Sequence, residues 1–133
     1  MDTDVVAAAV LGESTSGEQA ARLLGGNWDF AAPSHWKAEF SNVLWKAVRF
    51  GRIAAEEVDA IINRAGALPI ESVEVAELWR GAVARAIAAA HPAYDTLFVE
   101  LASRLRTRVA SFDGRFQRKF PSIVKSPGDL LVS

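Results

Sequence analysis

Four acidic side chains stand at the edges of apolar segments in this chain, where a carboxylate is costly unless something binds it. They are Asp2, Glu39, Asp95 and Asp113. Asp2 precedes an apolar run, Glu39 and Asp95 lie in helix-like stretches, and Asp113 follows a strand-like segment. Desolvating an unpaired carboxylate is unfavourable, so each must be hydrogen-bonded, paired with a cation or bound to a metal. If the fold brings the four together, their oxygens form a cage suited to Mg²⁺ or Mn²⁺.

The composition is that of a single globular domain spanning residues 1–133. Half of the residues are apolar, and the longest apolar run, at 5–11, is far too short to cross a membrane. The chain has no cysteine, which excludes disulfides and thiolate zinc sites and fits a reducing cytoplasm. An acidic rather than basic amino-terminal region argues against a signal peptide. We therefore expect a cytoplasmic protein that does not enter the membrane.

The net charge of −1 hides a basic segment near the carboxyl end. This basic run surrounds Asp113 and consists of Arg104, Arg106, Arg108, Arg115, Arg118 and Lys119. Such a run is either a solvated surface or a site that binds RNA phosphates beside the acidic residues. No RNA-binding motif with stacking aromatics accompanies it, so a base preference cannot be read from the sequence.

Helix-like and strand-like segments alternate along the chain. Apolar spacing and capping residues predict helices over 5–11, 15–24, 36–48, 56–65, 77–90 and 93–105, the third of them capped by Ser34. Strands are expected at 28–32, within 68–75 and at 108–111, with a turn at Asp113-Gly114. This alternation predicts an α/β domain whose parallel strands are joined by crossover helices. Ligands of such sheets bind beyond the carboxyl ends of the strands, where Asp113 would lie.

Four segments carry a family resemblance. Asp2-Thr3-Asp4-Val5 resembles the opening motif of PIN-domain ribonucleases, and Glu39 in Ala38-Glu39-Phe40 resembles that family's helix glutamate. The segment Ala93-Tyr94-Asp95-Thr96-Leu97-Phe98 is similar to its Tyr-Asp-Ala-Leu-Tyr block, and Val109-Ala110-Ser111-Phe112-Asp113 to its Val-Thr-x-Asp block. The blocks occur in the family's order from Asp2 to about Phe116, with the spacing of the small VapC-like toxins.

The resemblance implies a three-layer α/β/α PIN-like domain with a short, mostly parallel central sheet. It also implies a Mg²⁺- or Mn²⁺-dependent endoribonuclease that acts as the toxin of a toxin–antitoxin pair. A VapB-like antitoxin would neutralise it, and the protein would form a homodimer. By analogy, metal binding falls to Asp2, Asp95 and Asp113, and orientation of a metal-bound water to Glu39, whose possible role as a base stays open. The supporting residues would be Thr3, Asp4 and Ser111.

The chain departs from the family pattern at two places. The family has a hydrophobic strand before its first aspartate, whereas only Met1 precedes Asp2 here, so the strand is shortened or the true start lies upstream. Asp4 stands where the family has Ser or Asn, and it either adds a carboxylate to the site or substitutes for Asp2. Two other functions stay open: a catalytically idle PIN-like binding module, and a housekeeping RNA-processing nuclease.

Several further side chains carry expectations of their own. Glu100 is expected on an exposed helix face. His35 and His91 are expected to cap or pack rather than bind metal. Trp45 and Phe50 are expected to be exposed for a partner.

Overall fold

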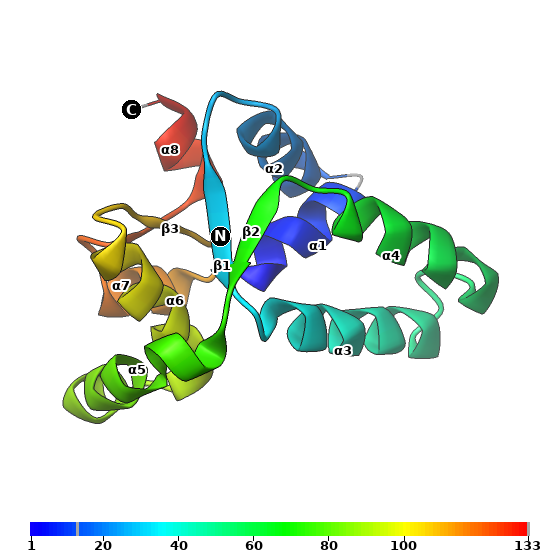
Figure 1. Cartoon of the computed structure of the whole chain (residues 1–133). Helices are drawn as coiled ribbons and strands as arrows, with labels where there is room; N and C mark the ends of the chain where they lie inside the picture. Colours follow the sequence, from blue (N-terminus) through cyan, green and yellow to red (C-terminus); the bar gives the residue numbers. More distant parts are fainter. Residues whose placement is uncertain (13, 133) are drawn as a thin grey trace.

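The computed structural model describes residues 1–12 and 14–132, and most of them are helical (Figure 1). In chain order the elements are α1 (Thr3–Leu11), α2 (Thr15–Leu24), β1 (Phe30–Pro33), α3 (Trp36–Arg49), the 3₁₀ turn η1 (Ala55–Glu57), α4 (Val58–Gly66), β2 (Ile70–Val73), α5 (Val75–Ala89), α6 (Ala93–Arg104), β3 (Val109–Ala110), α7 (Gly114–Lys119), β4 (Val124–Lys125) and α8 (Pro127–Val132).

The strands form two separate parallel pairs. β1 pairs with β2 from Phe30 opposite Ile70 to Pro33 opposite Val73, and β3 pairs with β4 at Val109 opposite Val124. Helices connect the strands of each pair, α3 and α4 in the first and α7 in the second. The expected α/β class with parallel strands and crossover helices is therefore confirmed.

The first two residues lie between the two strand pairs. The amino group of Met1 donates to Ala31 O at 2.8 Å, and the backbone N–H of Asp2 donates to Ala110 O at 2.9 Å. Successive residues of an extended chain turn their polar groups to opposite sides, so this dipeptide contacts β1 with one residue and β3 with the next. It is a short bridge between the pairs.

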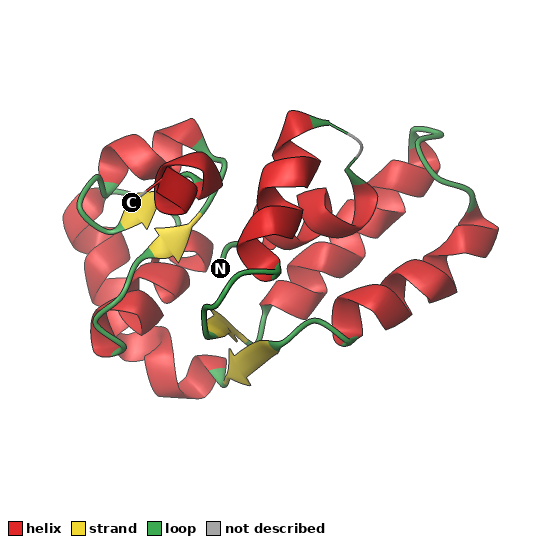
Figure 2. Cartoon of the chain, turned by 90° about the horizontal axis from the view of Figure 1, so that it is seen from above, coloured by secondary structure: helices red, strands yellow, loops and turns green. Residues whose placement is uncertain are grey.

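Helices cover the strands on both sides (Figure 2). The main core is built around almost inaccessible side chains from several elements, among them Val5, Val6, Phe98 and Phe116. A second core joins α5 to α6 through Leu78, Ala82, Leu97 and Leu101. This apolar burial positions the helix ends that carry the acidic residues.

Close packing of α5 on α6 surrounds Glu100, which was expected to be exposed, so that prediction is wrong. Its side chain is only 12 % exposed, and it accepts hydrogen bonds from Arg85 Nε at 2.9 Å and Arg104 Nε at 2.7 Å. A Cβ at Gly81 would overlap the Glu100 carboxylate, so the glycine is what leaves room for it. Burial alone would raise the pKa of Glu100, but the two arginines outweigh it and hold that pKa below its ordinary value.

Two other expectations about local structure need correction, and two short elements were missed. Ser34 does not cap α3: His35 holds the N-cap position, and Ser34 Oγ instead accepts from the backbone N–H of Val75 at 3.2 Å. Asp113-Gly114 is the start of α7 rather than a plain turn. The short elements β4 and α8 were not expected at all. None of the helices in the described part of the chain has the length and apolar character needed to cross a membrane.

Candidate functional site

The predicted acidic residues all lie at the amino-terminal ends of helices. Asp2 and Asp113 are the N-caps of α1 and α7, and Glu39 and Asp95 lie in the first turns of α3 and α6. Asp4, in the first turn of α1, joins them. Free backbone N–H groups and the helix dipole favour negative charge at such ends. The fold thus offers a local reason for placing each carboxylate where it is.

Ser111 connects three of these acids. Its hydroxyl, which is fully buried, donates to Asp2 Oδ2 at 2.7 Å and lies 3.3 Å from Asp4 Oδ2. It also accepts from the backbone N–H of Asp113 at 3.1 Å. Asp4 Oδ2 receives a further bond from the Phe112 N–H at 3.0 Å. The loop after β3 is therefore hydrogen-bonded to the carboxylates of Asp2 and Asp4 at the start of α1.

Glu39 has a neutral partner from α1. Thr3 Oγ1 donates to Glu39 Oε1 at 2.8 Å, and His35 Nε2 lies 3.5 Å from the same oxygen. His35 also lies 3.0 Å from Tyr94 O and packs its ring against Phe98, with 5.1 Å between ring centroids. Burial lowers the pKa of His35, which favours its neutral form.

Asp95 contacts His91, which lies just before the first residue of α6. His91 Nε2 lies 2.8 Å from Asp95 Oδ2, and the His91 ring stacks on Phe116 at a centroid distance of 5.4 Å. The sequence predicts that His91 packs, and this is confirmed by its ring contact with Phe116, but it does not predict the contact with Asp95. His91 precedes α6, whose first residue is Ala93, so helical periodicity could not have connected the two side chains.

Charge repulsion links all five carboxylates. The pKa of Asp2 is raised to about 6, mainly by burial and also by the charges of Asp95 and Glu39, against the lowering effect of the hydrogen bond from Ser111. The pKa of Asp4 is likewise raised to about 7, first by burial and then by the charges of Asp2 and Asp113. The pKa of Glu39 is raised by burial and then by Asp95. The structure thus brings Asp2, Asp4, Glu39, Asp95 and Asp113 into one electrostatic unit, here called the acidic cluster.

The side chains of this cluster are turned toward local partners rather than toward a shared centre. Within residues 1–12 and 14–132, no three His, Asp or Glu side chains are arranged to hold a metal ion as they stand. Asp113 Oδ1, for example, accepts from the backbone N–H groups of Arg115 and Phe116 at 2.9 and 3.2 Å. A carboxylate that lacks a cation gains stability by accepting such bonds.

One buried oxygen of the cluster has no such partner among the described residues. Asp4 Oδ1 is buried and has no hydrogen-bond partner in the described part of the chain. An unsatisfied buried carboxylate oxygen beside further acids needs either a proton or a cation. The donors here are hard oxygens, so the residues fit Mg²⁺ or Mn²⁺ in their chemistry, provided that the side chains rotate toward a common ion.

The fold separates the six residues of the predicted basic run into two groups with different surroundings. Arg104 is engaged by Glu100 and donates to Glu77 O, and Arg106 and Arg108 line a cavity beside β3. The other three members lie exposed on α7, directly after Asp113, and are Arg115, Arg118 and Lys119. Any phosphate contact beside the acidic cluster would therefore come first from α7.

Comparison with known proteins leaves the family open. No family model matches the chain, and no curated protein matches it.

Proposed function

We propose that this protein is a divalent-metal-dependent endoribonuclease of the PIN type. The observation that carries the proposal is the acidic cluster: five carboxylates at the starts of four helices, with the pKa of Asp2 and Asp4 raised to about 6 and about 7. A fold gains nothing in stability from such crowding, so a site that binds a cation is the simplest reason for it.

The proposed architecture is a three-layer α/β/α domain with one central sheet. The bridge formed by Met1 and Asp2 supports it, because its hydrogen bonds to Ala31 and Ala110 connect the two strand pairs in the order β2, β1, bridge, β3, β4. The helices on both sides of the strands in Figure 2 would be the outer layers. Asp2 then lies at the carboxyl end of the central position, where α/β sheets bind ligands.

The roles of the side chains follow from their contacts. Asp2, Asp95 and Asp113 would hold Mg²⁺ or Mn²⁺, which when bound acidifies water and offsets charge on the phosphodiester. Glu39 would orient the attacking water, with Thr3 fixing its carboxylate through the 2.8 Å hydrogen bond. The remaining supporting groups act on these ligands: Ser111 orients Asp2, His91 orients Asp95, and Asp4 adds negative charge.

RNA would reach this site over α7. Arg115, Arg118 and Lys119 project from the helix that Asp113 caps, and their charge would offset the repulsion between the acidic cluster and the substrate backbone.

The proposed setting is a toxin–antitoxin pair in the cytoplasm, with a homodimeric toxin. Two large aromatic side chains near the end of α3 support a partner surface: Trp45 is 56 % exposed and Phe50 69 % exposed. Arg49 lies over both rings, 5.5 and 5.9 Å from their centroids. An amphipathic segment of a VapB-like antitoxin would cover these aromatics and place a basic side chain in the acidic cluster.

The test is cleavage of a single-stranded RNA by the purified protein. We expect cleavage with Mg²⁺ or Mn²⁺, none with EDTA, and a loss of at least a hundredfold in Asp95→Asn, because charge is lost without loss of shape. Asp59→Asn, which removes an exposed carboxylate from α4, is the matched control and should cleave like the native chain. Undiminished cleavage by Asp95→Asn would remove this residue from the site.

A second candidate is a catalytically idle PIN-like binding module. It is favoured by the side chains that already satisfy the acids, such as His91 at Asp95 and the α7 backbone at Asp113. This reading predicts that the protein binds RNA or a partner equally well with and without divalent metal, and that no RNA is cut under either condition.

A further inference from the structure

Tyr94 presents an aromatic ring to solvent beside the acidic cluster. It directly precedes Asp95 in the first turn of α6, and it is 69 % exposed. Single exposed aromatic residues are common on protein surfaces, so exposure alone says little about this one. The residues around Tyr94 show what its ring can bind.

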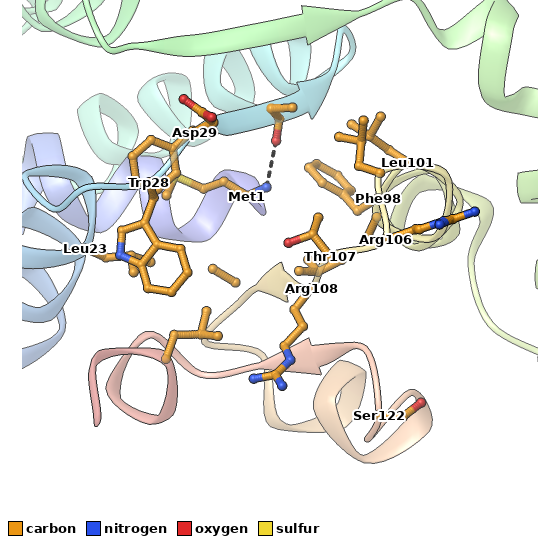
Figure 3. Close-up of a pocket in the computed structure, with 17 residues that line it drawn as sticks. Met1, Leu23, Trp28, Asp29, Phe98, Leu101, Arg106, Thr107, Arg108 and Ser122 are labelled. Carbon is orange, nitrogen blue, oxygen red and sulfur yellow. Dashed lines mark hydrogen bonds between the residues drawn. The ribbon is translucent and has the colours of Figure 1, made fainter. Parts of the chain in front are cut away.

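His35, the N-cap residue of α3, supports the ring of Tyr94. Its Nε2 lies 3.0 Å from Tyr94 O, and because a carbonyl oxygen only accepts hydrogen bonds, this nitrogen is the donor. The two rings lie 26° from parallel, with 6.1 Å between their centroids. The imidazole also packs on Phe98, whose buried ring turns from α6 into the cavity of about 500 Å³ between the strand pairs (Figure 3). The Tyr94 ring is therefore supported from the protein side and mostly open to solvent.

The same imidazole places the ring at the edge of the acidic cluster. His35 Nε2 lies 3.5 Å from Glu39 Oε1. Burial lowers the pKa of His35, and the charges of Asp2 and Asp95 oppose this shift, so both carboxylates act on the imidazole. Tyr94 thus lies on the α3 side of the cluster.

Basic side chains approach the cluster from another helix. The segment at the start of α6 contacts α3 through Tyr94, whereas it contacts α7 through the stacking of His91 on Phe116. The exposed basic residues of α7 follow Asp113 and are Arg115, Arg118 and Lys119. An RNA strand that passes from α7 across the acidic cluster would reach Tyr94 next.

The position of His35 is unfavourable for stability alone. Its Nδ1 is buried and has no hydrogen-bond partner among residues 1–12 and 14–132. Because Nε2 carries the proton, Nδ1 is an acceptor that has given up its hydrogen bond to water. A buried polar atom without a partner calls for a reason beyond packing, and the support of an exposed ring beside the cluster is one.

The surroundings of Tyr94 suit a nucleobase better than a protein partner. Protein partners cover wide apolar patches, whereas Tyr94 stands beside an imidazole and carboxylates. A flat base can stack on a single exposed ring. Only an unpaired base can do so, because the bases of a duplex are already stacked within it.

We propose that Tyr94 is a stacking residue for the RNA substrate, and that an unpaired base lies on its open face while a neighbouring phosphodiester occupies the acidic cluster. Stacking on Tyr94 would make the site select single strands over duplexes. The inference rests on the proposed nuclease function for the identity of the ligand, and measuring binding apart from cleavage separates the two.

The test is binding of short single-stranded RNAs in which one base at a time is replaced by 2-aminopurine, whose fluorescence falls when it stacks on an aromatic ring. Ca²⁺ replaces Mg²⁺ in the binding assay, and cleavage in Mg²⁺ is measured separately. Tyr94→Ala removes the ring, whereas Tyr94→Phe and Tyr94→Trp keep one. Trp79→Ala removes a ring that is 60 % exposed on α5 and is the matched control. A duplex of the same sequence is the control ligand.

With the native chain, fluorescence should fall at a particular position of the single strand. Tyr94→Ala should abolish this change and weaken binding of the single strand by about tenfold, with binding of the duplex unchanged. Tyr94→Phe, Tyr94→Trp and the control Trp79→Ala should all bind the single strand within about twofold of the native chain.

The inference would be overturned by equal binding of the single strand to the native and Tyr94→Ala chains, by an equal loss on both ligands, or by a Tyr94→Phe chain that binds as weakly as Tyr94→Ala. No binding of RNA by the native chain would also overturn it. So would a changed oligomeric state of Tyr94→Ala in size-exclusion chromatography, because the ring would then contact another protein chain. The expected binding pattern without any cleavage in Mg²⁺ would instead contradict the nuclease proposal and leave this inference standing.

Discussion

Asp4 is the residue at which the acidic cluster should cost the metal-free fold most stability. It is buried, its Oδ1 has no hydrogen-bond partner in the described part of the chain, and its pKa is raised to about 7. A carboxyl group whose pKa is higher in the folded than in the unfolded state binds protons more tightly when folded. Its contribution to stability is full below the unfolded value of 3.8 and is lost as the pH rises to about 7. Replacing Asp4 by Asn removes the charge and keeps an acceptor for the Phe112 N–H.

The size of the effect follows from the pKa. A rise from 3.8 to about 7 disfavours the ionised folded state by about 4 kcal/mol, at roughly 1.4 kcal/mol per unit. The new amide must itself be accommodated in the place of Oδ1, which costs about 1–3 kcal/mol when a polar group lacks a partner. We therefore expect Asp4→Asn to gain about 2 kcal/mol at pH 8, or roughly 5–10 °C in the unfolding midpoint.

The assay is thermal unfolding in EDTA at pH 4, 5, 6, 7 and 8. The native chain should lose stability steadily from pH 4 to pH 8, and the Asp4→Asn chain should lose less. Because the cost of the amide does not depend on pH, the two curves should cross at about pH 5, and the Asp4→Asn chain should be the less stable one at pH 4. Asp59→Asn, an exposed charge removal, should follow the native curve within about 0.5 kcal/mol. Parallel curves for the native and Asp4→Asn chains, or a less stable Asp4→Asn chain at pH 8, would refute the reasoning.

Two further substitutions test hydrogen bonds in the structure. One changes Ser111, which contacts the acidic cluster, and the other changes Glu100, which lies between α5 and α6. Ser111→Ala removes the donor to Asp2 and should cost about 1–3 kcal/mol in urea unfolding, whereas Ser103→Ala on an exposed position should cost less than about 0.5 kcal/mol. Glu100→Gln weakens the bonds from its two arginine partners and should lower stability by about 1–2 kcal/mol in thermal unfolding. If it changes stability no more than the exposed Glu56→Gln does, the bonds from Arg85 and Arg104 to Glu100 contribute nothing to stability.

The sequence predicted the long elements better than the short ones. The helix at 15–24 and the helix near 36–49 were found because their apolar residues recur at helical spacing, and both are present. β4 has two residues and α8 has six, too few for a periodic pattern to appear. The parallel arrangement was predictable from the alternation of helices and strands, but the separation into two pairs depends on the local geometry at Met1 and Asp2.

The acidic residues were visible in the sequence, whereas their partners were not. Their position beside apolar segments identified each carboxylate as a residue that needs compensation. The compensation itself comes from across the fold: Ser111 reaches Asp2 over a sequence separation of 109 residues, and Arg85 reaches Glu100 from the preceding helix. Glu100 was misjudged for this reason, because a single helix pattern does not contain the neighbour that buries one of its faces. Metal binding and cleavage at the cluster stay predictions.

The most direct measurement of the central claim, that the acidic cluster is a divalent-metal site, is a titration with Mn²⁺ at pH 8 followed by electron paramagnetic resonance. The native chain should bind Mn²⁺ saturably, and so should Asp59→Asn. The Asp2→Asn/Asp95→Asn double variant should bind at least tenfold more weakly, because it removes two of the carboxylates proposed as ligands while keeping their shapes. Equal Mn²⁺ affinity in the native chain and the double variant, or no saturable binding by the native chain, would contradict the account.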